Sequence, residues 1–285
     1  MSAAGRASRR GMAPSRGARR GLTWAGLALL LLVNCIPPLL VVRQAFAPLG
    51  EPPGMPLRLL PGRLSLGHLA QLLETQNLLG RIGLSLWVAV ATTALALALG
   101  FPAGWGAVHL RRLGDVMTRL SLASRILPPI AVAIPLTALL IPVGLYDHPF
   151  GLGLVVAHLT LGLPFAILLA YAAFREVPGE LEESARVDGC TPLGAFWRIA
   201  LPSVRGSLAG AMILVFLLSW DEFAYALLIQ LTNRTLPPLI YYFTSYGDMG
   251  SASTLAVVML VPAAGVIFVL QGLLTRGALT GGVKE

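Results

Sequence analysis

Charged residues are scarce in this sequence. Only 12% of its 285 residues are Asp, Glu, Lys or Arg, whereas 56% are hydrophobic, and the mean hydropathy is +0.76. A water-soluble domain contains about one quarter charged residues, because its surface must be solvated. The low charge content therefore excludes a soluble globular protein and indicates that most of the chain lies in lipid.

Lysine is almost absent. Of the 21 basic residues only Lys284, next to the last position, is a lysine. A P-loop needs a lysine that reaches the nucleotide phosphates, and Schiff-base or pyridoxal chemistry needs one as a nucleophile. The chain therefore cannot bind ATP through a P-loop. We expect that it is not an enzyme and that it has no catalytic residues.

Residues that bind metals or form disulfides are also few. Cys35 and Cys190 are too far apart for a disulfide framework or a cysteine-based zinc site, so we expect free thiols. The four histidines lack metalloprotease spacing, and no glycine-rich dinucleotide fingerprint occurs. We expect no metal and no cofactor. His158, within an apolar run, is expected to be satisfied by a neighbouring helix rather than to bind a transported ligand.

The positive net charge of +8 does not indicate nucleic acid as a partner. Six arginines lie within the first twenty residues with no acid among them, directly before an apolar run. This is the pattern of a tail that sets the orientation of a membrane protein. The predicted partners of the chain body are membrane lipid and other proteins.

Six apolar runs are long enough to cross a membrane as helices, which needs about 20 residues each. We therefore predict an all-α membrane protein with six transmembrane helices. An uncleaved first crossing is favoured over a signal peptide, since its apolar segment is too long for one. The predicted crossings are Leu22–Val42, Ile82–Leu110, Leu120–Leu145, Leu152–Phe174, Ser207–Leu231 and Ser253–Thr275.

The basic residues predict the orientation. With both termini in the cytoplasm, 16 of the 21 lie on the inner side, as the positive-inside rule requires. This topology divides the chain into an Arg-rich tail (1–20), a first transmembrane helix (21–43), a proline-rich extracytoplasmic loop (44–80), a transmembrane core (81–276) and a cytoplasmic C-terminal tail (277–285).

Two acidic residues, Asp221 and Glu222, lie inside a predicted crossing, whereas the other 11 acids lie in loops or at the C-terminus. A carboxylate in lipid costs at least about 2.5 kcal/mol, so it should face water, a partner or the headgroups. Trp220 and Phe223 bracket the pair. We predict that these four residues line a solute pathway or contact another subunit; the alternative is that the acids reach the outer headgroups.

The loop between the fourth and fifth crossings, residues 175–206, concentrates charge in a chain that has little. Pro178 fits the start of a first short helix and Gly189 its stop, with Leu181 and Ala185 on one face. Thr191 and Pro192 fit the cap and first turn of a second helix. Five acids suit an anionic membrane surface poorly, so this amphipathic hairpin predicts a protein partner.

The run E-S-A-R-V-D-G-C-T-P-L-G-A-F-W-R-I-A-L-P, from Glu183 to Pro202, resembles the cytoplasmic coupling loop of ABC importer permeases. The family pattern is E-A-A, three residues, G, nine residues, I-x-L-P, and only Ser184 departs from it. The positions that the resemblance assigns to ATPase coupling are Glu183, Ala185, Asp188, Gly189, Ile199, Leu201 and Pro202.

Other segments extend the resemblance from about Arg81 to the C-terminus. R-I-L-P-P-I-A-V-A-I-P (Arg125–Pro135), S-W-D-E-F (Ser219–Phe223) and the ending R-G-A-L-T-G-G-V-K-E (Arg276–Glu285) are similar to segments of the maltose-type, carbohydrate-uptake subgroup. The first eighty residues fit only in general pattern.

The resemblance implies an inner-membrane importer with a second permease subunit, a cytoplasmic ATPase dimer and an extracytoplasmic solute-binding protein. The hairpin would be seated in the ATPase, which Gly281–Lys284 would also reach. The implied solute is a sugar or polyol. Because the subgroup usually has asparagine where this chain has Asp221, a cationic solute such as a polyamine is an alternative, and so is a pair between Asp221 and an arginine of the partner permease.

Two rival interpretations remain from the residues alone. A self-contained secondary transporter or channel could use Asp221 or Glu222 as an ion site, but it would leave the hairpin unexplained. A membrane enzyme could use the same carboxylates as acid and base, but no nucleophile accompanies them.

Overall fold

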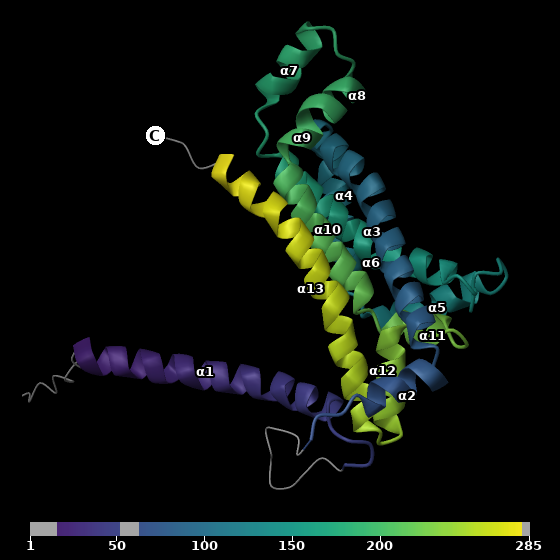
Figure 1. Cartoon of the computed structure of the whole chain (residues 1–285). Coiled ribbons are helices and arrows are strands. Elements are labelled where there is room, and N and C mark those ends of the chain that lie inside the picture. Colours follow the sequence, from purple (N-terminus) through teal and green to yellow (C-terminus); the bar gives the residue numbers. More distant parts are fainter. Residues whose placement is uncertain (1–15, 52–62, 281–285) are drawn as a thin grey trace, which may run out of the picture.

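The computed structural model describes residues 16–51 and 63–280, which form helices and no strand (Figure 1). The all-α prediction is confirmed. Within these residues, four helices are each long and apolar enough to cross a membrane, namely α1 (Arg16–Ala45), α3 (Leu78–His109), α6 (Leu152–Phe174) and α13 (Met249–Thr280). Two further pairs of helices are sharply bent at a break, namely Arg112–Ser124 with Pro129–Leu140 and Pro192–Ser203 with Arg205–Trp220. If each pair is one span, the described residues contain six candidate spans.

The centre of the molecule is formed by α3, α6 and α10 (Arg205–Trp220), which pack against one another. Small residues allow α3 and α6 to approach closely. A Cβ atom added to Gly100 would lie 2.6 Å from the Cβ of Ala166, and one added to Gly104 would lie 2.5 Å from the Cβ of Ala170. The spacing of Ala96, Gly100 and Gly104 therefore serves helix packing.

The third predicted crossing is not one continuous helix. Instead of a single helix over Leu120–Leu145, α4 (Arg111–Ser124) and α5 (Pro129–Leu140) meet at an angle of 100°. Pro128 and Pro129 lie at the junction; proline lacks the N–H of a helical hydrogen bond and disfavours helix in the residue before it. The predicted crossing is therefore a bent pair of helices.

The fifth predicted crossing, Ser207–Leu231, is also interrupted. Helix α10 ends at Trp220, and α11 (Ala224–Ile229) begins after a break at residues 221–223. A loop then leads to α12 (Leu236–Ser245), which packs against α13. The two acids of this crossing thus lie at a break and not within a helix.

The two ends of the bundle carry different elements (Figure 1). One end holds α2 (Gly67–Thr75) and α12. The opposite end holds α7 (Gly179–Val187), α8 (Pro192–Ala195), the π-helix η1 (Phe196–Ala200) and α9 (Leu201–Ser203), and α13 ends on this side too.

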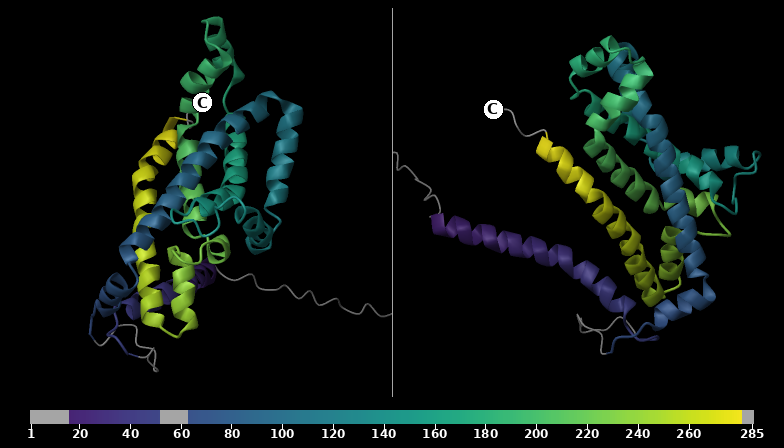
Figure 2. Two further views of the ribbon diagram at one scale, coloured as in Figure 1. Left: turned by 90° about the vertical axis from the view of Figure 1, so that its right-hand side faces the viewer. Right: turned by 45° about the horizontal axis from the view of Figure 1, so that its top comes forward.

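Helix α1 stands away from the bundle, as Figure 1 and the right view of Figure 2 show. Its apolar stretch is exposed along its length, and contact is made near its C-terminal end, where Thr254 of α13 donates a hydrogen bond to the carbonyl of Ala45. Most of the predicted N-terminal tail, part of the 44–80 loop and the last five residues lie outside the described residues.

Candidate functional site

The segment of residues 175–206, here called the hairpin, projects beyond the long helices (Figures 1 and 2). Helix α7 follows Pro178, and the chain turns at Gly189, whose φ is +89°. The Thr191 hydroxyl then accepts a hydrogen bond from the N–H of Gly194 at 3.1 Å, and α8 begins with Pro192. The predicted starts and stop of the two short helices are confirmed.

The outer surface of the hairpin combines apolar side chains with acidic and basic ones, the latter including Arg186 and Arg198. Val187, Leu193 and Trp197 are exposed by 87%, 63% and 58%, and Glu183 and Asp188 are exposed beside them. Large exposed apolar side chains on a charged segment are typical of a surface that contacts another protein or a membrane.

The inner surface of the hairpin packs on the helix bundle. Ala185 and Phe196 are buried, and Phe196 belongs to a core that includes residues of α3, α6 and α10. Leu181, predicted to lie on the same face as Ala185, is 47% exposed. Of the residues assigned to coupling, Ala185 is buried, Ile199 and Leu201 are half-buried, and Glu183, Asp188, Gly189 and Pro202 are exposed.

The hairpin is also joined to α3 by polar contacts that the sequence did not reveal. The indole N–H of Trp105 donates to both carboxylate oxygens of Glu182, at 3.1 and 3.2 Å. His109 Nε2 lies 3.3 Å from the same carboxylate. A tryptophan and a histidine four residues apart at the end of an apolar run are the signal that could have indicated these contacts.

At the break between α10 and α11, Glu222 is satisfied by backbone donors. Its Oε1 accepts hydrogen bonds from the N–H groups of Ala224 and Tyr225, and its Oε2 accepts from those of Tyr225 and Ala226, at distances of 2.8 to 3.2 Å. The first N–H groups of a helix have no partner within the helix. The Glu222 carboxylate therefore caps α11, and this explains why it is buried.

His158 of α6 joins the same buried group. Its Nδ1 lies 2.7 Å from the hydroxyl of Ser219 in α10, and its Nε2 lies 3.5 Å from Oε2 of Glu222. Nearby, the Tyr225 hydroxyl is hydrogen-bonded to that of Thr160. As expected, a neighbouring helix supplies a partner for His158, but only for Nδ1; the buried Nε2 makes no hydrogen bond within the described residues. The histidine thereby connects α6 to the end of α10.

The remaining residues around the break point in different directions. Trp220 is buried, donates to the carbonyl of Met259 at 3.2 Å and stacks on Phe216. Asp221 is exposed, and Phe223 is half-buried with its ring 5.4 Å from that of Tyr241 in α12. Of the four residues predicted for a pathway or subunit contact, Asp221 and Phe223 are thus available to another molecule.

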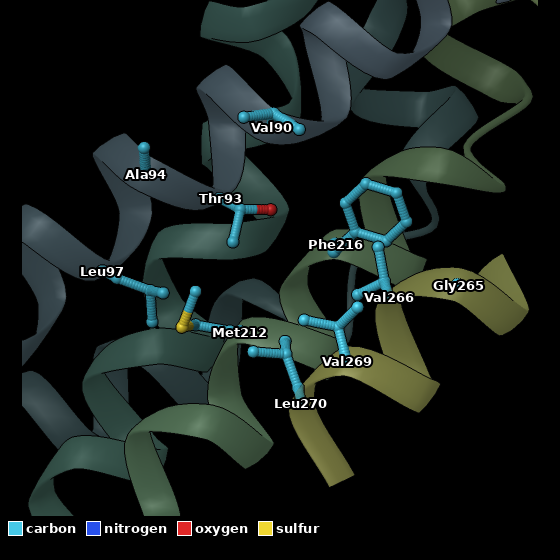
Figure 3. A pocket seen from close by; sticks show the side chains of 10 residues that line it. All are labelled: Val90, Thr93, Ala94, Leu97, Met212, Phe216, Gly265, Val266, Val269 and Leu270. Carbon is cyan, nitrogen blue, oxygen red and sulfur yellow. The ribbon is translucent and has the colours of Figure 1, made fainter. Parts of the chain in front are cut away.

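A separate pocket of about 360 Å³ lies between α3, α10 and α13 (Figure 3). The Thr93 hydroxyl in its wall donates to the carbonyl of Ala89, so it is already paired. The pocket suits an apolar occupant and not a hydrophilic solute. The pocket is lined by Val90, Thr93, Ala94, Leu97, Met212, Phe216, Gly265, Val266, Val269 and Leu270.

In the residues that the structure describes, no cluster of three or more His, Cys, Asp or Glu could hold a metal ion.

Residues 96–279, which include α6, the hairpin and the break, match the family described as the binding-protein-dependent transport system inner membrane component. The chain belongs to this family. It is therefore a multi-pass permease subunit of an ABC importer in the inner membrane, and it is not an enzyme, because a separate subunit hydrolyses ATP.

Curated relatives cover nearly the whole permease. It is 28% identical over 279 residues to the trehalose transport system permease protein SugB of Mycobacterium tuberculosis, covering 94% of this chain and 99% of that one. It is 26% identical over 270 residues to the sulfoquinovosyl glycerol transport system permease protein SmoH of Agrobacterium fabrum, covering 92% and 93%.

Solved structures share the fold of this permease. A chain of a bacterial ABC transporter involved in import of the acidic polysaccharide alginate aligns with a TM-score of 0.64 at 18% identity, covering 90% of this chain and 96% of that one. A chain of the inward-facing MetNI methionine ABC transporter aligns with a TM-score of 0.55 at 16% identity, covering 71% and 99%.

Proposed function

We propose that this permease forms half of the translocation pathway of an ATP-driven importer for a neutral sugar or polyol, together with a second permease subunit. The observation that carries the proposal is the hairpin, which exposes Val187, Leu193 and Trp197 at one end of the helix bundle. A chain without a P-loop lysine cannot supply its own energy from ATP, so the energy must arrive through a contact surface.

In this proposal the hairpin is on the cytoplasmic side and docks in one subunit of the ATPase dimer. Glu183 and Asp188 lie beside the exposed apolar side chains and would meet polar or basic groups of the ATPase. Both termini are then cytoplasmic, and the end with α2 and α12 faces the extracytoplasmic solute-binding protein. ATPase closure would move the helices as rigid bodies and alternate the access of the pathway.

The solute pathway is placed at the break between α10 and α11. The exposed Asp221 carboxylate can accept hydrogen bonds from hydroxyl groups, and the adjacent Phe223 offers an apolar ring edge. The carbohydrate solutes named for SugB and SmoH support a sugar. A second candidate is a cationic solute such as a polyamine, and the observation that supports it is the exposed negative charge of Asp221.

Reconstitution tests the proposal directly. The permease is incorporated in vesicles with its partner permease, ATPase and binding protein, and uptake of labelled trehalose, other disaccharides and spermidine is measured with and without ATP. We expect ATP-dependent uptake of a saccharide that excess spermidine does not inhibit. Uptake of spermidine instead would establish the cationic solute, and uptake without nucleotide would contradict the importer.

A further inference from the structure

We infer that Trp105 and Glu182 are positioning residues that connect both arms of the hairpin to α3, so that movement of the hairpin is passed into the membrane. This inference rests on the proposed contact between the hairpin and the ATPase. The coupling pattern in the sequence begins at Glu183 and includes neither residue.

The side chain of Trp105 contacts the two arms at once. Its N–H donates to both oxygens of Glu182 in α7, the first arm. Its ring lies 5.1 Å from that of Phe196 in η1, the second arm, at a tilted angle. Because Trp105 belongs to α3, a single side chain joins the two arms to a helix that lies more than seventy residues earlier in the sequence.

His109, one helical turn beyond Trp105, adds a second contact whose strength depends on protonation. Its Nδ1 lies 2.9 Å from the carbonyl oxygen of Trp105. A carbonyl only accepts, so Nδ1 must carry the hydrogen, and Nε2 can then donate to Glu182 only when the ring is doubly protonated. Trp105 is therefore the donor that Glu182 keeps in both protonation states of His109.

The region around Trp105 is packed firmly enough to transmit a displacement. Phe174 of α6 lies between Phe101 of α3 and Phe196, with ring centroids 5.9 and 6.0 Å apart. Further along, Gly100 and Gly104 bring α3 against α6 with no room for a Cβ atom. Tightly packed helices move as units, so a force on Glu182 or Phe196 is carried by α3 and α6 together.

Glu182 and the neighbouring Glu183 differ in how far their side chains are exposed. The Glu182 side chain is only 14% exposed and faces α3, whereas Glu183 is exposed on the outer surface. A largely desolvated carboxylate that loses its hydrogen-bond donor still bears the free-energy cost of its burial, so the contact of Glu182 with Trp105 contributes to holding the hairpin on α3. The two glutamates thus have separate tasks, one toward the permease and one toward the ATPase.

The test uses the whole reconstituted importer and two variants that cut the contact from either side. Trp105→Phe keeps an aromatic ring beside Phe196 but removes the N–H, and Glu182→Leu removes the acceptor while keeping similar volume. We expect both variants to bind the ATPase and hydrolyse ATP while importing about tenfold less solute per ATP, as loss of one hydrogen bond to a carboxylate predicts. The double variant should be no worse than the more severe single variant, because both remove one contact.

The matched control is Glu180→Leu, the same change two residues earlier in α7, at an exposed side chain that lies outside the coupling pattern. It should leave both ATPase association and the solute imported per ATP near wild type. Wild-type import per ATP in both Trp105→Phe and Glu182→Leu would overturn the inference. Parallel losses of thermal stability, ATPase binding and import would also overturn it, because they would show a purely structural contact. If the wild-type complex itself gives no ATP-driven uptake, the proposed function has failed instead.

Discussion

The sequence contains two pairs of adjacent acids, Glu182–Glu183 in the hairpin and Asp221–Glu222 at the break between α10 and α11. In each pair one carboxylate is turned inward and one is exposed. Glu182 faces α3 and Glu222 is buried, whereas Glu183 and Asp221 are both exposed. The same local sequence feature thus provides an internal contact and a group available to another molecule.

The inward carboxylates differ in where their partners come from. Glu222 is bound by the N–H groups of the three residues that start α11, so its contact is local and fixes the shape of one segment. Glu182 is bound by Trp105, 77 residues away in the sequence. A break in a helix frees backbone donors nearby, whereas an intact helix leaves none for its own side chains. Glu222, at a break, therefore stabilises the start of α11, whereas Glu182, within α7, connects the hairpin to α3.

The largest effect is expected from Glu222→Leu. It removes the acceptor of the N–H groups of Ala224, Tyr225 and Ala226, the last two of which are buried, at a cost of about 1–3 kcal/mol for each buried donor left unpaired. The thermal midpoint of the purified permease and its amount in membranes should both fall. Asp221→Leu, the same change at the exposed neighbour, is the control and should leave both near wild type. Equal losses in the two variants would remove the distinction between inward and outward acids.

A smaller effect is expected from Gly189→Val at the turn of the hairpin. The φ of +89° favours glycine, and the position faces open space, so backbone strain of about 1–3 kcal/mol is the only cost. In the reconstituted importer the variant should bind the ATPase more weakly, and ATP hydrolysis should be uncoupled from solute uptake. Gly189→Asn is the matched control, because asparagine adopts positive φ more readily. Normal coupling with valine would contradict the assignment of the hairpin.

The smallest effect is expected from Asp221→Asn. Asparagine keeps a hydrogen-bond acceptor for a hydroxyl group and loses only the charge, so uptake of a neutral saccharide should change by less than about threefold. The thermal midpoint should not change, since the side chain is exposed. A large loss of saccharide uptake in a fully assembled complex would show that the negative charge itself is needed.

Much of the fold follows from the sequence because lipid imposes simple rules on length and composition. The fourth crossing, predicted as Leu152–Phe174, has the same bounds as α6. Pro178, Gly189 and Thr191 define the short helices of the hairpin through local backbone chemistry. Such features depend on neighbours in sequence, and they are the ones that sequence patterns report best.

The interrupted spans and the hairpin contacts were harder to predict. Asp221 and Glu222 looked like charges that needed water, because hydropathy does not show that a chain break supplies N–H donors. The contact between Trp105 and Glu182 depends on how α3 meets α7 in space, and neither residue stands out alone. Pro128 and Pro129 indicate a bend in the third crossing, but a pair of prolines does not specify the angle of 100° between α4 and α5.

The central claim is that the hairpin is the surface through which the ATPase acts, and cysteine labelling tests it most directly. In a chain carrying Cys35→Ser and Cys190→Ser, the variant Val187→Cys places a thiol on the hairpin at a position 87% exposed. Leu64→Cys, at the opposite end and 80% exposed, is the control. In the purified complex, ATPase should slow maleimide labelling of the Val187→Cys variant by roughly tenfold or more, as burial in an interface predicts, and leave the Leu64→Cys rate unchanged. Unchanged labelling of the Val187→Cys variant in a complex that still imports solute would contradict the account.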